Sequence, residues 1–411
     1  MGVKVLILHQ HFKVPWHGGA IRSYYLARAL ARAGHKVVVL SGHNGDYRRE
    51  TIDGIDVHWL PVRYDNRFAF PDRTRSFLRY IYLVIRRSQL YAGADICYAI
   101  SVPLTTGLAA LWIRRTHRIP YIFEVGDLWP DAPIALGFIK SQWLKGFLYG
   151  LEKKIYNRAR AIVALSPPIK SAIEGRINNK TVHLIPNMSD TCFYYPSERD
   201  LQVEQEFQVQ GRFVVTYAGA LGYANGLDYL LRCAGVCQAG QLPVSFLIFG
   251  DGAEGAGLQR TAMQLGLRNI AFLPFQDRVG VRKIFSITDA VFVCYRPVAI
   301  LETGSPNKYF DGLSAGKLIV VNFSGWIREE IERESCGIYV DPINAGSFVD
   351  GIGPFMNDKP LLKRYQNNSR RLAEQKYSRN ELSKKFNGIL IATTMKPTIA
   401  TFLYLPKPAN N

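Results

Sequence analysis

The sequence has no uninterrupted apolar run of about 18 residues, the length that a helix needs to cross a bilayer. It has only six cysteines in 411 residues, and Cys233 and Cys237 lack the second Cys/His pair of a zinc site. The first apolar segment, Val3–Leu8, is followed at once by a loop and predicts a strand rather than a signal peptide. We therefore expect a cytoplasmic protein with reduced thiols that can lie on a membrane but not cross it.

Acidic residues are scarce in the first half of the chain. Residues 1–190 contain 27 Lys and Arg against 13 Asp and Glu, whereas the remainder contains 24 against 20. The net charge of +18 is therefore concentrated in one half. This asymmetry favours a polyanionic partner for that half, either anionic lipid or nucleic acid. The alternative is a surface charge that serves only solubility.

Short apolar segments alternate with segments of helical spacing, a pattern typical of parallel sheets covered by helices on both faces. In the first half the expected strands are Val3–Leu8, Lys36–Leu40, Ile55–Leu60, Asp95–Ile100, Pro120–Glu124, Ala161–Leu165 and Thr181–Ile185. In the second half they are Phe213–Ala218, Val244–Phe249, Ile270–Phe275, Ala290–Cys294, Leu318–Asn322 and Gly337–Val340. The polar stretch Ser197–Gly211 predicts the link between the halves, and the chain after Pro360 is expected to be helical to about Ile391.

The expected fold class is α/β, with two tandem doubly wound, Rossmann-like domains that face each other across a cleft. We place the domains at residues 1–195 and 196–360. Helices that cross back occupy 361–411, with a frayed tail at Pro406–Asn411. Ligands bind in such folds at the carboxyl ends of the strands.

Glycine turns follow two of the expected strands. Gly18-Gly19 precedes an expected helix, where the backbone can approach a phosphate closely and helix N–H groups can bind it, although a plain tight turn explains the glycines equally well. Gly250, Gly252 and Gly255 match G-x-G-x-x-G, but the match follows the second strand of its series rather than the first. This misplacement disfavours a dinucleotide cofactor.

The segment Glu302–Lys317 contains the most informative spacing. Pro306 at the start of an expected helix leaves free N–H groups for a pyrophosphate, and Lys308 in the first turn adds a positive charge. Asp311 lies one turn further, where its carboxylate can accept hydrogen bonds from both hydroxyls of a ribose. A surface Lys–Asp pair that only stabilises its own helix is the alternative.

At these residues the sequence resembles glycosyltransferase family 4, the retaining enzymes with the GT-B fold. The resemblance runs through nearly the whole chain. Its segments are Gly18-Gly19, Pro186-Asn187, Tyr217-Ala218-Gly219, Gly250-Asp251-Gly252, and Pro306-Asn307-Lys308 through Ala315-Gly316. The segment Val125–Asp131, which reads VGDLWPD, looks like the branch that builds bacterial surface polysaccharides.

The resemblance implies a UDP-sugar-type donor bound mainly by the second domain, an acceptor on the side of the first domain, retention of anomeric configuration, and no bound metal or other cofactor. It implies that Asp311 is the ribose-binding acid, that Lys308 is a donor-side lysine, and that Gly18-Gly19 lies near the diphosphate. The donor-binding residues expected on this basis are Gly18, Gly19, Gly219, Gly250, Asp251, Arg296, Thr303, Pro306, Asn307 and Asp311.

Two features depart from the family pattern. Many members have two acids separated by seven intervening residues. With Asp311 as the second acid, the first position is Thr303 in this chain, and Glu302 is one place off. The usual basic pair after the first glycine of the second domain is missing from Leu221–Gly226. Lys308, helix ends or an arginine such as Arg296 must then neutralise the diphosphate.

The expected catalytic residues are Lys308 and Asp127. Departure of a nucleoside diphosphate requires stabilisation of growing negative charge, to which Lys308 and helix amino termini are suited. Asp127 follows an expected strand at the edge of the cleft and can orient an acceptor hydroxyl or the donor sugar. The alternative for Asp127 is a turn residue that only caps the following segment.

Two basic segments with aromatic residues predict contact with an anionic membrane surface. In Arg73–Arg87, helical spacing puts Arg75, Arg79 and Arg86 on one face, and Phe138–Arg160 adds Trp143 and several lysines. Such contact suits a lipid-linked acceptor such as a polyprenyl diphosphate sugar, and predicts a peripheral location on the inner face of the cell membrane. The alternative is an ordinary amphipathic helix with solvated arginines.

Two other functions remain open on the sequence alone. A nucleotide-sugar epimerase or phosphorylase of the same fold would act without a glycan acceptor. A nucleic-acid-binding protein is suggested by charge only, and we expect no nucleic-acid partner because the sequence contains no recognised nucleic-acid module. The sequence does not name the sugar, the base, the linkage or the acceptor.

Overall fold

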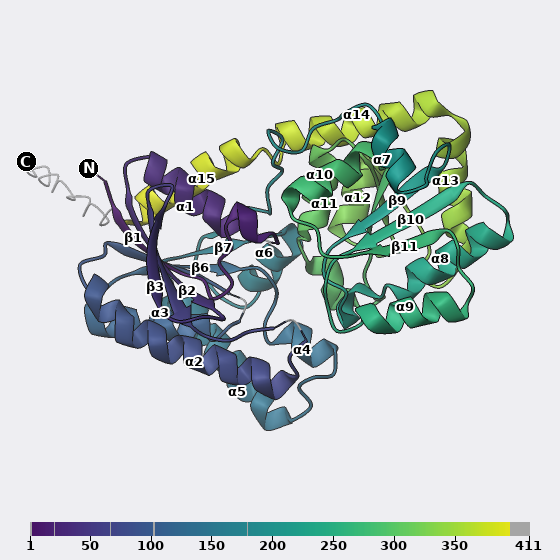
Figure 1. Ribbon diagram of the computed structural model, residues 1–411. Coiled ribbons are helices and arrows are strands. Elements are labelled where there is room, and N and C mark those ends of the chain that lie inside the picture. The colour runs from purple at the N-terminus through teal and green to yellow at the C-terminus, as the bar shows by residue number, and fades with distance from the viewer. Residues whose placement is uncertain (1, 20, 66, 102, 179, 395–411) are drawn as a thin grey trace, which may run out of the picture.

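The computed structural model describes residues 2–394 except 20, 66, 102 and 179. The expected frayed tail at Pro406–Asn411 lies outside the described residues. The chain forms two α/β lobes side by side, the first coloured purple to blue and the second teal to green (Figure 1). Each lobe is built around its own twisted sheet.

The first sheet has the strand order β3-β4-β2-β1-β5-β6-β7-β8. Every neighbouring pair is parallel except β3 and β4, which are antiparallel. Its strands are β1 (Lys4–Leu8), β2 (Lys36–His43), β3 (Arg48–Ile52), β4 (Ile55–Pro61), β5 (Ile96–Ile100), β6 (Tyr121–Val125), β7 (Ala161–Ala164) and β8 (Val182–Leu184).

Helices cover both faces of this sheet. They are η1 (Pro15–His17), α1 (Arg22–Arg32), α2 (Phe70–Ser88), η2 (Gln89–Tyr91), α3 (Thr106–His117), α4 (Asp131–Ala135), α5 (Gln142–Arg158) and α6 (Pro167–Glu174). Alternate residues of β1 enter different cores, because successive strand side chains point to opposite faces. Leu6 and Leu8 pack with α2, α3 and α5, whereas Val5 and Ile7 pack with α1.

The second sheet is parallel throughout, with the order β11-β10-β9-β12-β13-β14. Its strands are β9 (Phe213–Ala218), β10 (Val244–Phe249), β11 (Ile270–Leu273), β12 (Ala290–Val293), β13 (Leu318–Val321) and β14 (Gly337–Tyr339). The surrounding helices are α7 (Leu201–Glu206), η3 (Tyr223–Asn225), α8 (Asp228–Ala239), α9 (Gly255–Gln264), α10 (Arg278–Ile287), η4 (Ala299–Thr303), α11 (Asn307–Ser314), α12 (Trp326–Arg333) and α13 (Gly346–Asn357).

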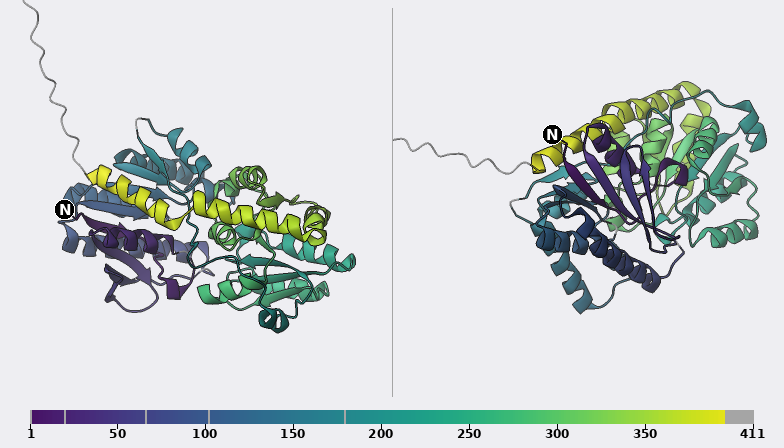
Figure 2. Two further views of the ribbon diagram at one scale, coloured as in Figure 1. Left: turned by 90° about the horizontal axis from the view of Figure 1, so that it is seen from above. Right: turned by 60° about the vertical axis from the view of Figure 1, so that its left-hand side comes forward.

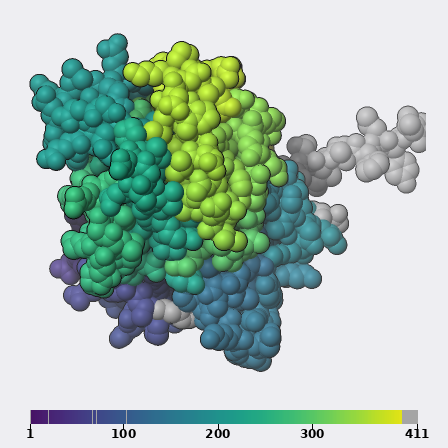
Figure 3. Space-filling view, turned by 90° about the vertical axis from the view of Figure 1, so that its right-hand side faces the viewer, coloured from purple at the N-terminus to yellow at the C-terminus, as the bar shows by residue number. Residues whose placement is uncertain are grey.

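The last two helices run across both lobes. Seen from above, α14 (Lys359–Gln375) lies over the second lobe and α15 (Arg379–Thr394) continues over the first (Figure 2). Leu382 and Phe386 of α15 pack into the core beneath α1. From the side of the second lobe, the yellow-green C-terminal helices lie over that lobe while the blue part of the first lobe projects below it (Figure 3). No helix in the described part of the chain is both long and apolar enough to span a membrane.

The expected fold class is confirmed: two Rossmann-like lobes face each other, and C-terminal helices cross back. All the expected strands of the first sheet pair in parallel, whereas β3, an edge strand that the sequence did not predict, pairs antiparallel with β4. The segment Arg48–Ile52 is largely exposed, so it has no apolar alternation by which to be found. The polar stretch Ser197–Gly211 also contains a short helix, α7.

Candidate functional site

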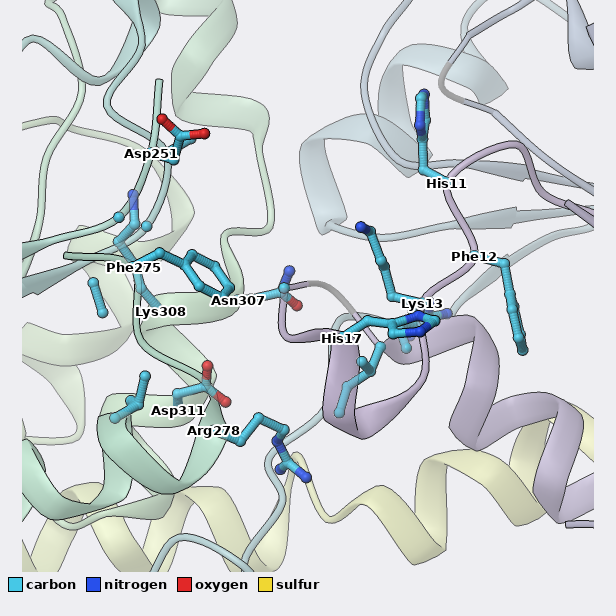
Figure 4. Close-up of a pocket in the computed structure, with 18 of the residues that line it drawn as sticks. His11, Phe12, Lys13, His17, Asp251, Phe275, Arg278, Asn307, Lys308 and Asp311 are labelled. Atoms are coloured by element: carbon cyan, nitrogen blue, oxygen red, sulfur yellow. The ribbon is translucent and has the colours of Figure 1, made fainter. Parts of the chain in front are cut away.

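A cleft of about 1020 Å³ lies between the carboxyl ends of the two sheets. Residues of both lobes line it, as Figure 4 shows for His11, Lys13 and His17 on one side and Lys308 and Asp311 on the other. Of the residues expected from sequence, those lining the cleft are Gly19, Gly219, Gly250, Asp251, Pro306, Asn307, Lys308 and Asp311. The fold thus brings together most of the expected donor side in one cavity of ligand size.

Lys308 is a buried cation without an acidic partner among the described residues. Its side chain is 9% exposed, and its Nζ donates hydrogen bonds to Tyr217 Oη (3.0 Å) and Asn225 Oδ1 (3.1 Å). Burial lowers the pKa of Lys308 to about 8. Because buried charges are normally paired, the cleft offers an incompletely satisfied positive charge to an anion.

The start of α11 also offers hydrogen-bond donors for an anion. Pro306 is the N-cap, and within the described part of the chain the backbone N–H groups of Asn307 and Lys308 have no hydrogen-bond partner. Asn187, from the segment joining the lobes, donates its side-chain amide to the Ser305 carbonyl and so holds the turn before the helix. The free N–H groups and the Lys308 ammonium together form an anion site.

Asp311 lies one turn along α11 and also lines the cleft. Burial and the nearby Asp190 carboxylate raise its pKa to about 7, against the opposing effect of Arg278. Arg278 donates to Asp190 Oδ2 (2.6 Å) and lies over the ring of Phe193 (4.1 Å). The raised pKa means that nearby positive charge does not fully compensate the negative charge of the Asp311 carboxylate. This carboxylate is suited to accept hydrogen bonds from ligand hydroxyls.

Glycines at the ends of β9 and β10 bring the backbone close to this anion site. A Cβ on Gly250 (φ +149°) would lie 1.7 Å from the Gly219 carbonyl oxygen. A Cβ on Gly219 (φ +154°) would lie 3.0 Å from Lys308 Cε. Both positions therefore require glycine, and Asp251, which follows Gly250, lies exposed at the lip of the cleft.

Gly18 and Gly19 lie at the first-lobe edge of the cleft, in the left-handed region with φ +65° and +78°. Gly19 lines the cavity, whereas Gly18 does not and instead faces Phe275 of the second lobe. A Cβ on Gly18 would lie 2.6 Å from Phe275 Cζ. Gly18 therefore permits close approach of the two lobes.

Asp127 does not line the cavity but lies beside it, in the loop between β6 and α4. Its side chain reaches solvent, yet the surrounding atoms desolvate the carboxyl and raise its pKa. Burial and the negative charge of Asp127 both raise the pKa of Tyr295, which lines the cleft from the second lobe. Asp127 thus faces the second lobe at the margin of the site.

Besides Gly18, two expected donor residues are not among those lining the cleft, Arg296 and Thr303. Arg296 Nε donates to the Tyr223 carbonyl (2.7 Å), and its guanidinium lies 3.7 Å from the Asp228 carboxylate. Thr303 ends η4, and its carbonyl accepts a hydrogen bond from Ser166 of the first lobe (2.5 Å). Arg296 thus holds the η3 segment, and Thr303 connects η4 to the first lobe, both next to the cavity.

The sequence did not predict several residues that line the cleft, among them Lys13, Arg22 and Arg278. Arg22 donates to Glu124 Oε2 (2.9 Å) and to the carbonyl of Ile185 (2.9 Å), which ties α1 to the segment joining the lobes. Arg278 begins α10, directly after the loop that follows β11. Arg278 could have been predicted from its position, because it is a basic residue just past the carboxyl end of the expected strand Ile270–Phe275.

The basic residues predicted to contact a membrane lie on the outside of the first lobe. Arg75, Arg79 and Arg86 occupy the exposed face of α2, while Val84 on its opposite face is buried. On α5, Trp143 is 78% exposed and stacks on Phe147, with ring centroids 5.8 Å apart. In Figure 1, α2 and α5 lie along the same side of the first lobe.

Comparisons with known proteins agree with this geometry. Residues 17–188 match the glycosyl transferase 4-like domain, and residues 198–372 match the glycosyl transferases group 1 domain. The chain belongs to the GT4-type glycosyltransferases. The transferase is 26% identical over 397 residues to the uncharacterized glycosyltransferase MJ1607 of Methanocaldococcus jannaschii, covering 90% of this chain and 92% of that one. It is 23% identical over 224 residues to WcaI of Escherichia coli K12, named for colanic acid biosynthesis, covering 53% of each chain.

Solved structures share the fold of the transferase. Sucrose-phosphate synthase from Thermosynechococcus elongatus has a TM-score of 0.78 at 14% identity, covering 95% of this chain and 98% of that one. HepE of Anabaena, solved with UDP-glucose, has a TM-score of 0.72 at 17% identity, covering 95% and 99%. WaaG, a lipopolysaccharide biosynthesis glycosyltransferase, has a TM-score of 0.69 at 15% identity, covering 94% and 99%. The expectation of a GT-B glycosyltransferase is therefore confirmed.

Proposed function

We propose that this transferase moves a sugar from a UDP-sugar-type donor to a lipid-linked glycan acceptor, with retention of configuration, in the biosynthesis of a surface polysaccharide. The observation that carries the donor part is Lys308, a buried ammonium without an acidic partner in the described chain, beside free N–H groups of α11. That UDP-sugar-bound HepE has the same fold supports the choice of nucleotide. The names of WcaI and WaaG support the pathway.

In this proposal the donor diphosphate lies between Lys308 and the start of α11, and Asp311 accepts the ribose hydroxyls. When the sugar–phosphate bond breaks, negative charge grows on the leaving diphosphate. Fixed N–H dipoles and the Lys308 ammonium stabilise this charge without reorganising. Positive charge thus comes from the protein itself in this account, and we propose that no bound metal or cofactor is needed.

The acceptor enters from the first lobe, where Asp127 lies beside Tyr295 at the margin of the cleft. We assign to Asp127 the orientation of the acceptor hydroxyl or of the donor sugar. Burial raises the pKa of this carboxyl group above its usual range. The exposed arginines of α2 and the Trp143–Phe147 pair of α5 would hold the first lobe at an anionic membrane surface, on the cytoplasmic side.

Calorimetric titration with UDP tests the donor site. Lys308→Met should weaken UDP binding about 10- to 150-fold, because a hydrogen bond to a charged group contributes about 1.5–3 kcal/mol. Asp311→Ala should weaken it as well, while the protein stays folded. Lys317→Met is a matched control, since Lys317 is also buried with a pKa lowered to about 8 but does not line the cleft. Equal UDP affinity in the Lys308 and Lys317 variants would refute the proposed donor site.

A further inference from the structure

The first-lobe wall of the cleft carries basic side chains that the proposed donor site does not use. Lys13, in the loop after β1, is exposed within the cleft and makes no ion pair or hydrogen bond with another described residue. Arg48, at the start of β3, lines the same wall. Its nearest carboxylate is that of Glu50 at 3.5 Å, and both side chains are about half exposed, so the pair neutralises little charge.

These two cations act on the same part of the wall. Burial and, next in size, the charge of Lys13 lower the pKa of His11 to about 4. Burial and the charge of Lys13 also lower the pKa of His17. Arg48 lowers the pKa of His17 as well. Figure 4 shows Lys13 and His17 on the first-lobe side, across the gap from Asn307 and Lys308. The imidazoles are therefore neutral at pH 7, and the positive potential comes from Lys13 and Arg48.

The carboxylates of the cleft are distributed unequally. On the first-lobe wall, Asp65 is paired with Arg67 at 2.8 Å. Between the lobes, Asp190 is paired with Arg278 and Arg379, each at 2.6 Å. The remaining carboxylates that line the cleft in the described chain are Asp251 and Asp311, both on the second lobe. The cleft thus has two separate cationic sites, Lys308 on one wall and Lys13 with Arg48 on the other.

We propose that Lys13 and Arg48 bind a phosphate group of the acceptor. This inference rests on the proposed function, because it takes the donor diphosphate to occupy the site at Lys308. Two anions can then be held on opposite walls, each by its own cations, which limits the repulsion between them. The buried ring of Trp59 lies 5.5 Å from the Arg48 guanidinium and helps to hold that side chain at the cleft wall.

The acceptor phosphate has two chemical sources, the diphosphate of a lipid carrier and the phosphate of a free sugar phosphate. The proposal concerns the phosphate that both share. A neutral glycan acceptor would not need these cations, so charge removal at Lys13 and Arg48 separates a phosphorylated acceptor from a neutral one.

Calorimetry with inorganic diphosphate as the probe tests this second site. Protein is first saturated with UDP and then titrated with diphosphate. The wild type should bind diphosphate, and K13Q/R48Q should bind it at least tenfold more weakly while its UDP affinity changes less than about twofold. Both side chains are solvent-exposed, so the variant is expected to fold. K36Q/R115Q, which removes two exposed charges at the amino end of β2 and on α3, is the matched control and should behave as the wild type.

The possible results are distinct. If UDP-saturated wild type binds no diphosphate, or if K13Q/R48Q binds it with unchanged affinity, the inference is overturned. If K13Q/R48Q loses UDP affinity to the same extent, the two cations belong to the donor site and the inference is also overturned. If the wild type does not bind UDP at all, the proposed function fails instead. Displacement of the probe by farnesyl diphosphate but not glucose 6-phosphate assigns the phosphate to a lipid carrier, and the reverse assigns it to a sugar phosphate.

Discussion

Lys308 and Asp311 lie one turn apart on α11, and burial moves the pKa of each toward neutrality. The pKa of Lys308 is lowered to about 8 and that of Asp311 is raised to about 7. The charged form of each side chain is therefore disfavoured in the free protein, and a bound diphosphate and ribose would favour it again. A site of this kind lowers the stability of the free protein and gains affinity for its ligand.

The affinity for UDP-glucose should accordingly depend on pH with a maximum between about 7 and 8. Below pH 7 Asp311 takes up a proton that binding must remove, and above pH 8 Lys308 loses a proton that binding must restore. On each side the affinity should fall by up to about tenfold per pH unit. UDP-glucose is the suitable probe because its diphosphate does not titrate in this range. Titrations from pH 5.5 to 9.5 that give a constant affinity would contradict this prediction.

Asp311→Asn should stabilise the free protein at high pH. The pKa of Asp311 is about 7 in the folded protein against 3.8 for the free group, so its carboxylate lowers the free energy of unfolding as the pH rises from about 4 to 7. The amide removes this effect, by at most about 4 kcal/mol at pH 8 and by less at pH 5. Urea unfolding at both pH values measures the difference. A variant less stable than the wild type at pH 8 would show that Asp311 has a structural role instead.

The sequence predicted Lys308 and Asp311 because both lie on one helix and their spacing is local. Lys13 and Arg278 could not be predicted in the same way, since they come from different lobes and line one cavity only when the lobes pack together. Arg296 shows the converse case. Its basic side chain was a reasonable diphosphate ligand, but Tyr223 and Asp228 hold it outside the residues that line the cleft.

At the scale of elements, the ends of β9 and β10 determine how closely backbone can approach the anion site. Gly219 and Gly250 leave the room in which Lys308 lies against the loop after β9. The helix α11 follows directly from a segment held by the first lobe, through the Ser166 bond to Thr303 and the Asn187 bond to Ser305. Contacts between the lobes thus position the start of α11.

Gly250→Ala should destabilise the protein by more than about 2 kcal/mol and abolish UDP binding. The added Cβ would lie 1.7 Å from the Gly219 carbonyl oxygen, and the φ of +149° is strained for alanine. Gly257→Ala in α9 is the control, because a Cβ there meets no atom within 4 Å and alanine favours a helix. Thermal unfolding of the two variants, followed by UDP titration, makes the comparison. Similar melting temperatures for the two would mean that the β9–β10 turn adapts easily.

The strands of both sheets were predictable because a strand buried on both faces is a continuous apolar run. Their ends differ from the expected ones by a few residues at most, as in β11, which ends at Leu273 rather than Phe275. The edge strand β3 was missed because it is polar and, within the described residues, pairs with β4 alone. Its antiparallel pairing depends on the neighbouring strand rather than on its own sequence.

At the scale of the whole molecule, the helices α14 and α15 join the two lobes, and the cleft lies between the lobes. The helix α15 packs on α1, so the last described segment of the chain stabilises the first lobe. The exposed arginines of α2 and the exposed aromatics of α5 lie on the outside of this lobe. The sequence predicted which face of α2 is exposed, but not its position beside α5, which depends on the packing of α3 between them.

Replacing Arg75, Arg79 and Arg86 by Gln should reduce binding to vesicles of phosphatidylethanolamine with about one third phosphatidylglycerol. Each basic residue near such a surface contributes about 1 kcal/mol, so the loss should be at least tenfold in sedimentation assays. Replacing Arg260, Arg268 and Arg364, which are exposed on the second lobe and α14, removes the same charge and should have a smaller effect. Equal losses in both variants would mean that net charge alone governs binding.

The central claim is that a nucleotide diphosphate binds where the start of α11 faces the cleft. A crystal structure of the protein with UDP tests it most directly. The account predicts diphosphate oxygens within hydrogen-bond distance of Lys308 Nζ and of the backbone N–H groups of Asn307 and Lys308, with the ribose at Asp311. UDP bound elsewhere on the molecule, or a diphosphate that contacts neither Lys308 nor α11, would contradict it.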